Sequence, residues 1–151
     1  MLPVIFTGRH RPKVDDKRRM QVPSEWRGGR TGGIKYLFVP VARDGFDPAF
    51  IKVLPEHRLA KLYHRLDDLD EFDDEADALR RTVGADSVLV ETDGAGRVCL
   101  PDEMAKGAGL NGEVLLVGAM GHFEIWPQAR GDAALKADRP RALAKRRDLK
   151  V

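Results

Sequence analysis

Apolar and polar residues alternate in two short segments, residues 18–23 (RRMQVP) and residues 97–101 (RVCLP). Alternation with a period of two is typical of a half-buried β-strand, because successive side chains of a strand point to opposite faces. One face of each strand is therefore predicted to pack in the core, and it carries Met20, Val22, Val98 and Leu100. The opposite face carries Arg19, Gln21, Arg97 and Cys99.

A proline follows the alternating residues in each segment, Pro23 in the first and Pro101 in the second. Proline cannot donate a hydrogen bond to a central ladder, so each strand is predicted to end there. Ser24 and Asp102 are residue types that help to start a helix, and a short helical stretch is predicted after each proline. Further apolar strands are predicted at residues 36–41 and 49–55 in the first half, and at 113–118 and 122–127 in the second.

Two helices are predicted between these sets of strands. The first covers residues 55–66, because proline is tolerated in a first helical turn and apolar residues recur with the spacing of one helix face. The second covers residues 74–83. The acidic run at residues 66–77 has few groups to bury and is interpreted as a linker. Pro127 also stands where a helix can begin.

The second set of strands repeats the first. When the sequence is shifted by 78 positions, four residues of one phrase fall on their own type: Asp15 on Asp93, Arg19 on Arg97, Pro23 on Pro101 and Glu25 on Glu103. Self-similarity sustained over several elements indicates two copies of one supersecondary unit. Each unit is predicted to run strand, turn, strand, short helix, strand, strand.

The repeat divides the chain into four parts. They are repeat 1 at residues 6–55, a helical and acidic connection at 56–84, repeat 2 at 85–128 and a basic C-terminal tail at 129–151. One unit of this size has too little core to be stable alone, whereas two units in one chain can bury each other's apolar faces. The predicted fold is mainly β, a small barrel-like body with short helices at its edges.

The charged residues are unevenly distributed. The chain has 151 residues with 26 Lys and Arg against 24 Asp and Glu, so its net charge is only +2. Basic residues nevertheless dominate residues 9–35 and 136–150, and acidic residues dominate 66–77. Basic blocks of this kind can bind polyanions, above all nucleic acid. For the C-terminal tail the alternative is a solvated, frayed chain end, since nothing in it but charge indicates a site.

Each copy has an aspartate four residues before an arginine, Asp15 with Arg19 and Asp93 with Arg97, and each pair flanks a predicted tight turn. The second turn contains DGAG, and glycine-rich sequences are typical of turns. The aspartate can bridge the turn, orient the arginine guanidinium, or form a simple surface ion pair, which would contribute about 0–1 kcal/mol. The residue types leave these alternatives open.

Other classes of function receive little support. Cys99 is the one cysteine, so an internal disulfide is excluded, and a small half-buried residue is a better interpretation than a nucleophile. His57 and His64 are seven positions apart without a third ligand, so no metal site is predicted. The GAG at residues 94–96 lacks the lysine of a phosphate-binding loop. An enzyme, a cofactor and a small-molecule substrate are therefore not expected.

The sequence also bears on location. No apolar run approaches the roughly 20 residues that span a membrane, and the first ten residues lack the pattern of a secretory signal. A single cysteine fits a reducing compartment. We therefore expect a cytoplasmic protein without a membrane partner.

Five segments occur in one order along the chain: FTG at residues 6–8, VDDKRRMQVP at 14–23, DGAGRVCLP at 93–101, LLVG at 115–118 and HFEIWP at 122–127. Together they resemble the MraZ family of bacterial transcriptional regulators, which are built from two SpoVT/AbrB-type repeats. The resemblance runs from about Phe6 to about Gln128. It implies an AbrB-like fold of swapped hairpins, a double-split β-barrel, which assembles as a homo-oligomeric ring.

The same resemblance implies a function. It implies binding to double-stranded DNA at G-rich direct repeats, in the promoter of the division and cell-wall gene cluster, and hence association with the nucleoid. The Asp-x-x-x-Arg motif of the family falls on both aspartate–arginine pairs. The family usually has Lys-Gly-Arg in this turn, whereas the first copy has Lys17, Arg18 and Arg19. The missing glycine either strains the turn, if a positive φ is needed there, or adds a DNA-facing charge.

The motif and the charge pattern predict a DNA-binding site around the first turn. Arginine can donate two hydrogen bonds to O6 and N7 of guanine, which discriminates against other bases by about 1–3 kcal/mol. Arg19 is predicted to read DNA in this way, while neighbouring cations contact phosphates and add affinity without sequence information. The predicted DNA-binding residues are Arg19, Lys17, Arg18, Lys13, Arg11, Arg9 and Arg97, with Asp15 and Asp93 shaping the turns or orienting the arginines.

Two other functions are kept as alternatives. AbrB-type folds also occur in antitoxins, whose main partner is a toxin protein held through a flexible acidic tail. Here the acidic run is internal and the chain end is basic, which favours the regulator. The second alternative is a structural ring that binds polyanions without sequence preference.

Overall fold

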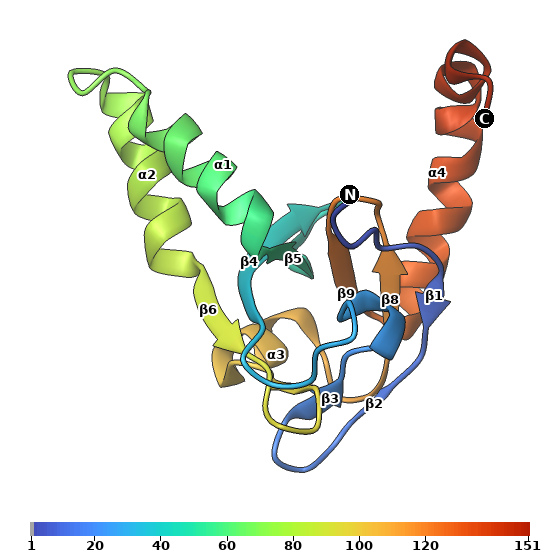
Figure 1. Cartoon of the computed structure of the whole chain (residues 1–151). Helices are drawn as coiled ribbons and strands as arrows, with labels where there is room; N and C mark the ends of the chain where they lie inside the picture. The colour runs from blue at the N-terminus through green and yellow to red at the C-terminus, as the bar shows by residue number, and fades with distance from the viewer. Residues whose placement is uncertain (1) are drawn as a thin grey trace.

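The computed structural model describes residues 2–151 (Figure 1). Repeat 1 contains β1 (Arg9–His10), β2 (Lys13–Val14), β3 (Arg19–Gln21), the 3-10 helix η1 (Ser24–Trp26), β4 (Lys35–Arg43) and β5 (Phe46–Pro55). Repeat 2 follows the same order, except that the single strand β6 (Val88–Glu91) stands in place of β1 and β2, and it continues with β7 (Arg97–Cys99), α3 (Asp102–Ala108), β8 (Gly112–Gly118) and β9 (Phe123–Pro127). The predicted order of elements in each unit is therefore confirmed.

The strands are exchanged between the repeats. β1 and β2 of repeat 1 pair with β8 of repeat 2, and β6 of repeat 2 pairs with β4 of repeat 1. β5 and β9 join the two halves, so the sheet order is β1-β8-β9-β5-β4-β6, with antiparallel pairing between these neighbours. Each repeat thus completes the sheet of the other, which is the predicted swapped arrangement.

An approximate two-fold axis relates the repeats. β3 and β7 form a separate two-stranded ribbon, in which Met20 lies opposite its equivalent, Val98. β5 and β9 meet in the same way at Lys52 and Glu124, which are equivalent when the repeats are aligned on their last prolines. Because the axis passes through the ribbon, the two aspartate–arginine turns lie at symmetric positions beside it.

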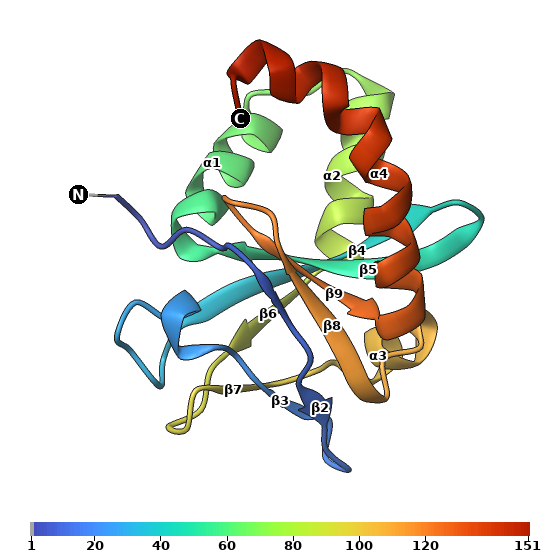
Figure 2. The ribbon, with the colours of Figure 1, turned by 90° about the vertical axis from the view of Figure 1, so that its right-hand side faces the viewer.

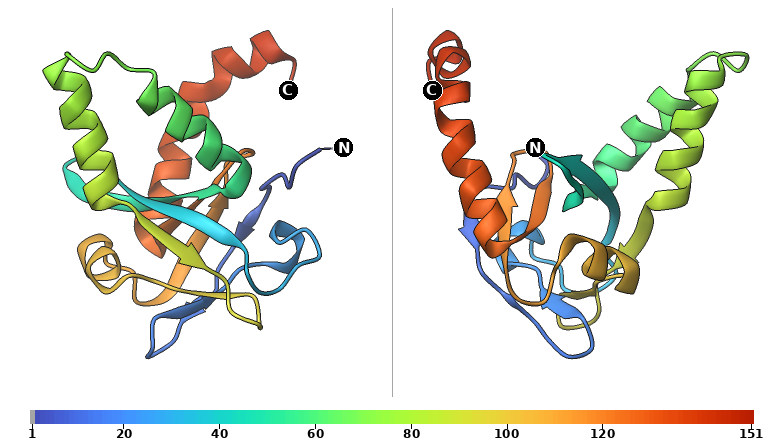
Figure 3. Two further views of the ribbon diagram at one scale, coloured as in Figure 1. Left: turned by 60° about the vertical axis from the view of Figure 1, so that its left-hand side comes forward. Right: turned by 180° about the vertical axis from the view of Figure 1, so that it is seen from behind.

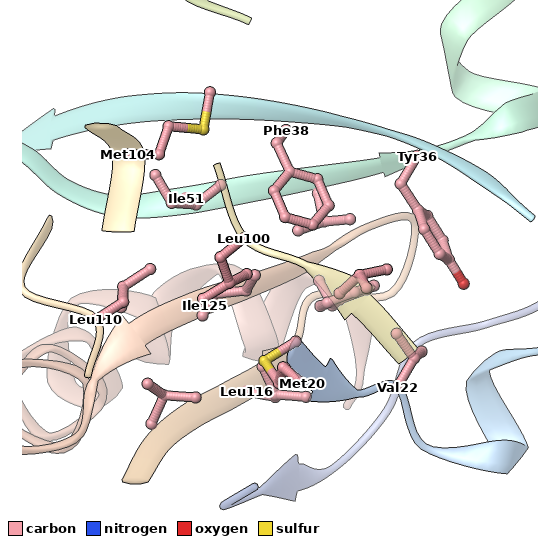
Figure 4. Close-up of a cluster of buried hydrophobic side chains, with 14 of the residues drawn as sticks. Met20, Val22, Tyr36, Phe38, Ile51, Leu100, Met104, Leu110, Leu116 and Ile125 are labelled. Atoms are coloured by element: carbon pink, nitrogen blue, oxygen red, sulfur yellow. The ribbon is translucent and has the colours of Figure 1, made fainter. Parts of the chain in front are cut away.

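The main core lies between the ribbon and the sheet (Figures 2 and 4). The four residues predicted to face the core are each at most 1% exposed: Met20, Val22, Val98 and Leu100. They pack in one cluster with Phe38, Ile51 and Ile125 from the long strands. Full burial of such a side chain contributes about 1.5–3 kcal/mol, so the ribbon is firmly held and its other face must point outward.

Two helices join the repeats, α1 (Glu56–Asp67) and α2 (Asp74–Asp86), close to the predicted ranges. They form a hairpin that projects from the β body (Figure 1). The acidic run supplies the turn of this hairpin and the start of α2. There the Asp73 side chain accepts hydrogen bonds from the backbone N–H groups of Glu75 and Ala76, at 2.9 and 3.4 Å. The run is therefore only partly a linker, because acidic residues stabilise a helix N-terminus.

The C-terminal region is a helix, and the alternative of a frayed end is wrong. α4 (Gln128–Leu149) has 22 residues. Its first half packs on β8 and β9, where Ala134 and Leu135 contact the cluster that contains Leu115 and Trp126. The charge pattern misled the prediction, because the few apolar residues of this segment are enough to dock its first three turns.

Two ion pairs fasten α4 to the body. Arg11 donates to both carboxylate oxygens of Asp132, at 3.0 and 2.7 Å, and Arg43 donates to both oxygens of Asp138, at 3.0 and 2.7 Å. Hydrogen bonds from these arginines hold the pKa of both aspartates below the ordinary value. Since the partners lie far apart in sequence, no local pattern indicates either pair.

Gly131 sets the distance between α4 and the sheet. A β-carbon at this position would lie 2.8 Å from Leu115 Cδ2 and 2.8 Å from Trp126 Cβ. We expect Gly131→Ala to lower the melting temperature, because overpacking costs about 1–3 kcal/mol and outweighs the gain of about 1 kcal/mol in helix propensity. Gly84→Ala in α2 is the matched control, since no atom of residues 2–151 outside its own helix turn lies within 4 Å of the added carbon. Stabilisation by both substitutions would contradict this packing.

Candidate nucleic-acid interface

The first aspartate–arginine turn joins β2 to β3, at the end of the body opposite the projecting helices (Figures 1 and 3). Asp15 Oδ1 accepts hydrogen bonds from the backbone N–H groups of Lys17 and Arg19, at 2.9 and 2.8 Å. Asp15 Oδ2 accepts from Arg19 Nε at 2.8 Å. One carboxylate therefore both closes the turn and orients the guanidinium.

The second turn, between β6 and β7, has the same geometry. Asp93 Oδ1 accepts from the backbone N–H groups of Ala95 and Arg97, at 2.9 and 3.0 Å, and Asp93 Oδ2 accepts from Arg97 Nε at 2.9 Å. The two roles that the sequence left as alternatives are combined in each aspartate. Both arginines are held at Nε, and their two terminal nitrogens make no hydrogen bond within residues 2–151.

The turns also perturb the ionisation of their aspartates. The hydrogen bond from the backbone N–H of Arg19, reinforced by the Arg19 side chain, holds the pKa of Asp15 below its ordinary value. The backbone N–H groups of Arg97 and Ala95 do the same for the pKa of Asp93. The hydrogen bond to Asp15 raises the pKa of Arg19. Both turns are therefore built to keep their carboxylates charged.

These shifts predict how stability changes with pH. A carboxylate whose pKa is depressed by folding contributes stability that is complete above its unfolded pKa, about 4, and is lost as the pH falls through the folded pKa. We expect the melting temperature to be nearly constant from pH 7 to about pH 5 and to fall below about pH 4. The variant Asp15→Asn/Asp93→Asn should lose less of its own stability over the acid range. An acid dependence as steep as that of the unmodified chain would contradict the assignment.

The two turns are joined by the outer surface of the ribbon, which we call the ribbon face and define as Arg19, Gln21, Arg97 and Cys99. In the ribbon Arg19 lies opposite Cys99, and Gln21 lies opposite Arg97. Directly opposite residues of an antiparallel pair share a face, so the two arginines lie on the same surface. Their side chains are 35% and 36% exposed. The sequence therefore placed this face correctly.

Gln21 was not assigned a role from the sequence. Its side-chain Nε2 donates to the carbonyl of Ala95 at 2.9 Å, so the amide spans the ribbon to the second turn. The period-two pattern already placed Gln21 between the two arginines. That position was the available signal for a side chain that links the two turns across the ribbon.

Arg18 departs from the pattern of the second repeat. It adopts φ of 61°, and the equivalent Gly96 adopts φ of 78°. A residue other than glycine in this left-handed region costs about 1–2 kcal/mol, so the missing glycine does strain the first turn. The Arg18 side chain is used within the chain, since its Nε donates to the carbonyl of Leu100 at 3.1 Å and its guanidinium lies 3.8 Å from the Asp102 carboxylate.

The equivalent positions can be compared directly. We expect Gly96→Ala to destabilise the protein by about 1–2 kcal/mol, because alanine is strained at a positive φ. The added β-carbon would also lie 2.7 Å from the Arg27 guanidinium. Arg18→Gly should leave stability nearly unchanged, since relief of strain offsets a lost hydrogen bond of about 0.5–1.5 kcal/mol. Denaturant unfolding measures both variants, and a Gly96→Ala protein as stable as the Arg18→Gly protein would contradict the expectation.

The remaining cations predicted to bind DNA differ in whether an ion pair within the chain already holds them. Arg9, Lys13 and Lys17 are exposed on the segment that leads into the first turn. Arg11 lies on the same segment, but its guanidinium is occupied by Asp132 of α4. The structure thus brings Arg19, Arg97 and Lys17 to one end of the body, whereas Arg11 links that end to a helix.

Residues 2–151 contain no cluster of three or more His, Cys, Asp or Glu side chains suited to a metal ion. Within the same residues no helix has both the length and the apolar character that crossing a bilayer requires.

Comparison with known proteins bears on this arrangement. The family model described as "MraZ protein, putative antitoxin-like" matches residues 84–147. A "Transcriptional regulator MraZ" from Parvibaculum lavamentivorans is 35% identical over 144 residues, which cover 89% of this chain and 83% of that protein. A protein of the same name from Gluconacetobacter diazotrophicus is 31% identical over 144 residues, which cover 95% of this chain and 87% of that protein. This chain belongs to the MraZ family.

The match to the MraZ family model covers repeat 2 and most of α4, whereas the alignment with the Gluconacetobacter protein covers 95% of this chain and so includes both turns. A third relative, from Thermomicrobium roseum and also named "Transcriptional regulator MraZ", is 32% identical in an alignment of 128 residues that covers 81% of this chain and 81% of that protein. The family resemblance predicted from the phrases around the turns is therefore confirmed. The geometry adds that the arginine of each phrase, Arg19 or Arg97, lies on the same ribbon face.

Proposed function

We propose that this chain is a transcriptional regulator of the MraZ type that binds double-stranded DNA through the ribbon face. The observation that carries the proposal is the pair of equivalent turns, each of which holds an arginine at Nε and directs it outward from the same ribbon. The major groove of B-DNA admits a two-stranded β-ribbon. The relatives' shared name supports the regulatory role.

Within this interface the residues have distinct tasks. Arg19 and Arg97 present their terminal nitrogens to guanine, and Asp15 and Asp93 hold them in that direction. Lys17, together with Lys13 and Arg9, contacts phosphates, which contributes affinity without sequence information. Arg18 adds positive charge close to the DNA. The preferred sites are G-rich direct repeats in the promoter of the division and cell-wall gene cluster.

The active form is a homo-oligomeric ring. β1 and β6 are the outermost strands of the sheet path, and such edges present unpaired backbone groups that proteins commonly cover. A ring would repeat the ribbon face at regular spacing, so modest contacts with successive DNA repeats would multiply through avidity. Such a protein acts in the cytoplasm, on the nucleoid.

The main rival is an antitoxin-like protein whose principal partner is another protein, as the description of the matching family model allows. Exposed cations around the first turn favour a polyanion over a protein surface. A structural ring with incidental polyanion affinity is a further rival. Salt dependence would not separate these functions, because all cationic surfaces bind DNA less tightly at high salt.

A gel-shift titration with the DNA upstream of the protein's own gene separates them. The proposal predicts binding to that DNA at least tenfold tighter than to a scrambled duplex of equal length and composition. A footprint should then fall on direct repeats. Equal affinity for both duplexes would indicate a non-specific ring or a protein-binding module and would overturn the proposed function.

A further inference from the structure

The second half of α4 projects from the molecule without contacting the body (Figures 1 and 3). The last side chain that anchors it is Asp138, in its ion pair with Arg43. Every residue from 139 to 151 is exposed, including Leu143 and Leu149 at 51% and 73%. No surface of the single chain, residues 2–151, therefore covers this segment. Because isolated helices shorter than about 12–15 residues are marginal in water, packing against another surface would stabilise it.

An apolar groove lies on the other side of the β body, between α1, α2 and the edge formed by β4 and β6. It has a volume of about 510 Å³. Its apolar lining consists of Leu37, Leu59, Leu62, Tyr63, Leu66, Val83 and Leu89. Tyr63 and Leu89 are each 65% exposed, and Ser87 Oγ at the groove is buried without a hydrogen-bond partner in residues 2–151. Contiguous exposed apolar surface of this kind marks interaction sites.

The two projections carry opposite charge. The tip of the α1–α2 hairpin, residues 66–77, has eight acidic residues and no basic one. The distal part of α4, residues 139–151, has six basic residues and one acidic residue. Figure 1 and the right-hand view of Figure 3 place the hairpin and α4 on opposite sides of the body, so neither can neutralise the other within one chain.

We propose that the distal half of α4 of one copy docks in the α1–α2 groove of the next copy. Leu143 and Leu149 would cover the apolar lining, and the basic side chains would face the acidic tip. The lengths agree, since 11 residues of distal α4 and the 12 residues of α1 span about 16 and 18 Å. The contact is heterologous, and repeated contacts of this kind close into a ring when the rotation permits.

This interface rests on the proposed oligomer and gives it a geometry. The hairpin and α4 both project from the end of the body opposite the two turns (Figures 1 and 3). Docking through them therefore leaves the ribbon face of every copy free. Assembly and DNA binding are assigned to opposite ends of the chain, so variants at each end should separate the two properties.

Charge reversal tests the interface. Variant A carries Arg141→Glu, Lys145→Glu and Arg146→Glu in α4, and variant B carries Asp67→Lys, Asp68→Lys and Glu71→Lys in the hairpin. Light scattering should show that each variant alone falls from the wild-type mass toward the 16.8 kDa monomer. An equimolar mixture of A and B should recover the oligomer, because each groove then meets an α4 of opposite charge. Recovery also shows that neither variant had simply failed to fold.

The control variant changes charge far from the proposed interface. Lys13→Glu/Lys17→Glu changes charge at the opposite end and should weaken DNA binding while retaining the oligomer. If wild type is an oligomer that binds its operator and variant A keeps the same mass, the interface is wrong and the proposed function stands. If variant A loses DNA affinity at unchanged mass, distal α4 contacts DNA instead. A monomeric wild type would overturn both the interface and the proposed ring.

Discussion

Arg19→Ala is expected to reduce affinity for operator DNA, the direct repeats upstream of the protein's own gene, by about tenfold to a hundredfold. Affinity for random DNA should stay nearly unchanged. The Arg19 guanidinium is held by Asp15 Oδ2 at 2.8 Å on an outward-facing ribbon, so a contact with a base edge would need no further ordering of this side chain. Loss of a bidentate contact with guanine costs about 1–3 kcal/mol, and each 1.4 kcal/mol is a factor of ten. Fluorescence anisotropy with operator and scrambled duplexes measures the effect.

Arg97→Ala is the matched control, since the two turns have the same hydrogen bonds. It should weaken operator binding less, because no lysine or second arginine in its turn holds a phosphate nearby. Both variants should remain folded and assembled, since Met20 and Val98 continue to anchor the ribbon. An Arg19→Ala protein of wild-type mass that binds its operator with unchanged affinity would show that Arg19 does not read DNA.

The second large effect is expected from Lys13→Gln/Lys17→Gln. Each lost phosphate contact reduces the slope of log affinity against log salt by about 0.9. If several subunits of an assembly contact DNA, the loss of two phosphate contacts in each of them should lower the magnitude of this slope by several units. Affinity for operator and random DNA should fall in parallel, because phosphates carry no sequence information. Titrations at several salt concentrations measure the slopes.

Arg11→Gln is the comparison variant for this experiment. Arg11 lies on the same basic segment, but Asp132 already occupies its guanidinium. We expect it to change the DNA salt slope little and to lower the melting temperature instead, because it loosens α4. If the Lys13→Gln/Lys17→Gln protein kept the wild-type slope, the phosphate contacts would have to be assigned elsewhere.

Much of the fold could be predicted from the sequence because its signals are local. The period-two alternation of Met20 and Val22, and of Val98 and Leu100, gave both the buried and the outer face of the ribbon. The repeat gave the order of elements, and the aspartate–arginine spacing gave the turns. The leucine spacing of residues 55–66 gave α1 to within one residue.

The remainder depends on contacts that no local pattern encodes. Arg11 looked like a DNA-contacting cation, yet its partner Asp132 lies 121 positions away. The region after residue 128 looked like a charged tail, yet Gly131 allows a helix to approach Trp126 closely. That Arg18 contacts DNA stays a prediction, and no local pattern indicates its hydrogen bond to the Leu100 carbonyl, because that bond follows from the pairing of β3 with β7.

Site-directed cleavage of DNA tests whether the ribbon face lies on DNA while distal α4 lies away from it. In a Cys99→Ser background, Ala95→Cys places a single thiol at the tip of the second turn, and Ala144→Cys places one on distal α4. Each thiol is labelled with an iron chelate that cuts nearby DNA, and the cuts in the upstream DNA of the gene are mapped. We expect regularly spaced cuts at the direct repeats from position 95 and none from position 144. Bound DNA that is cut from position 144 and left intact from position 95 would contradict this expectation.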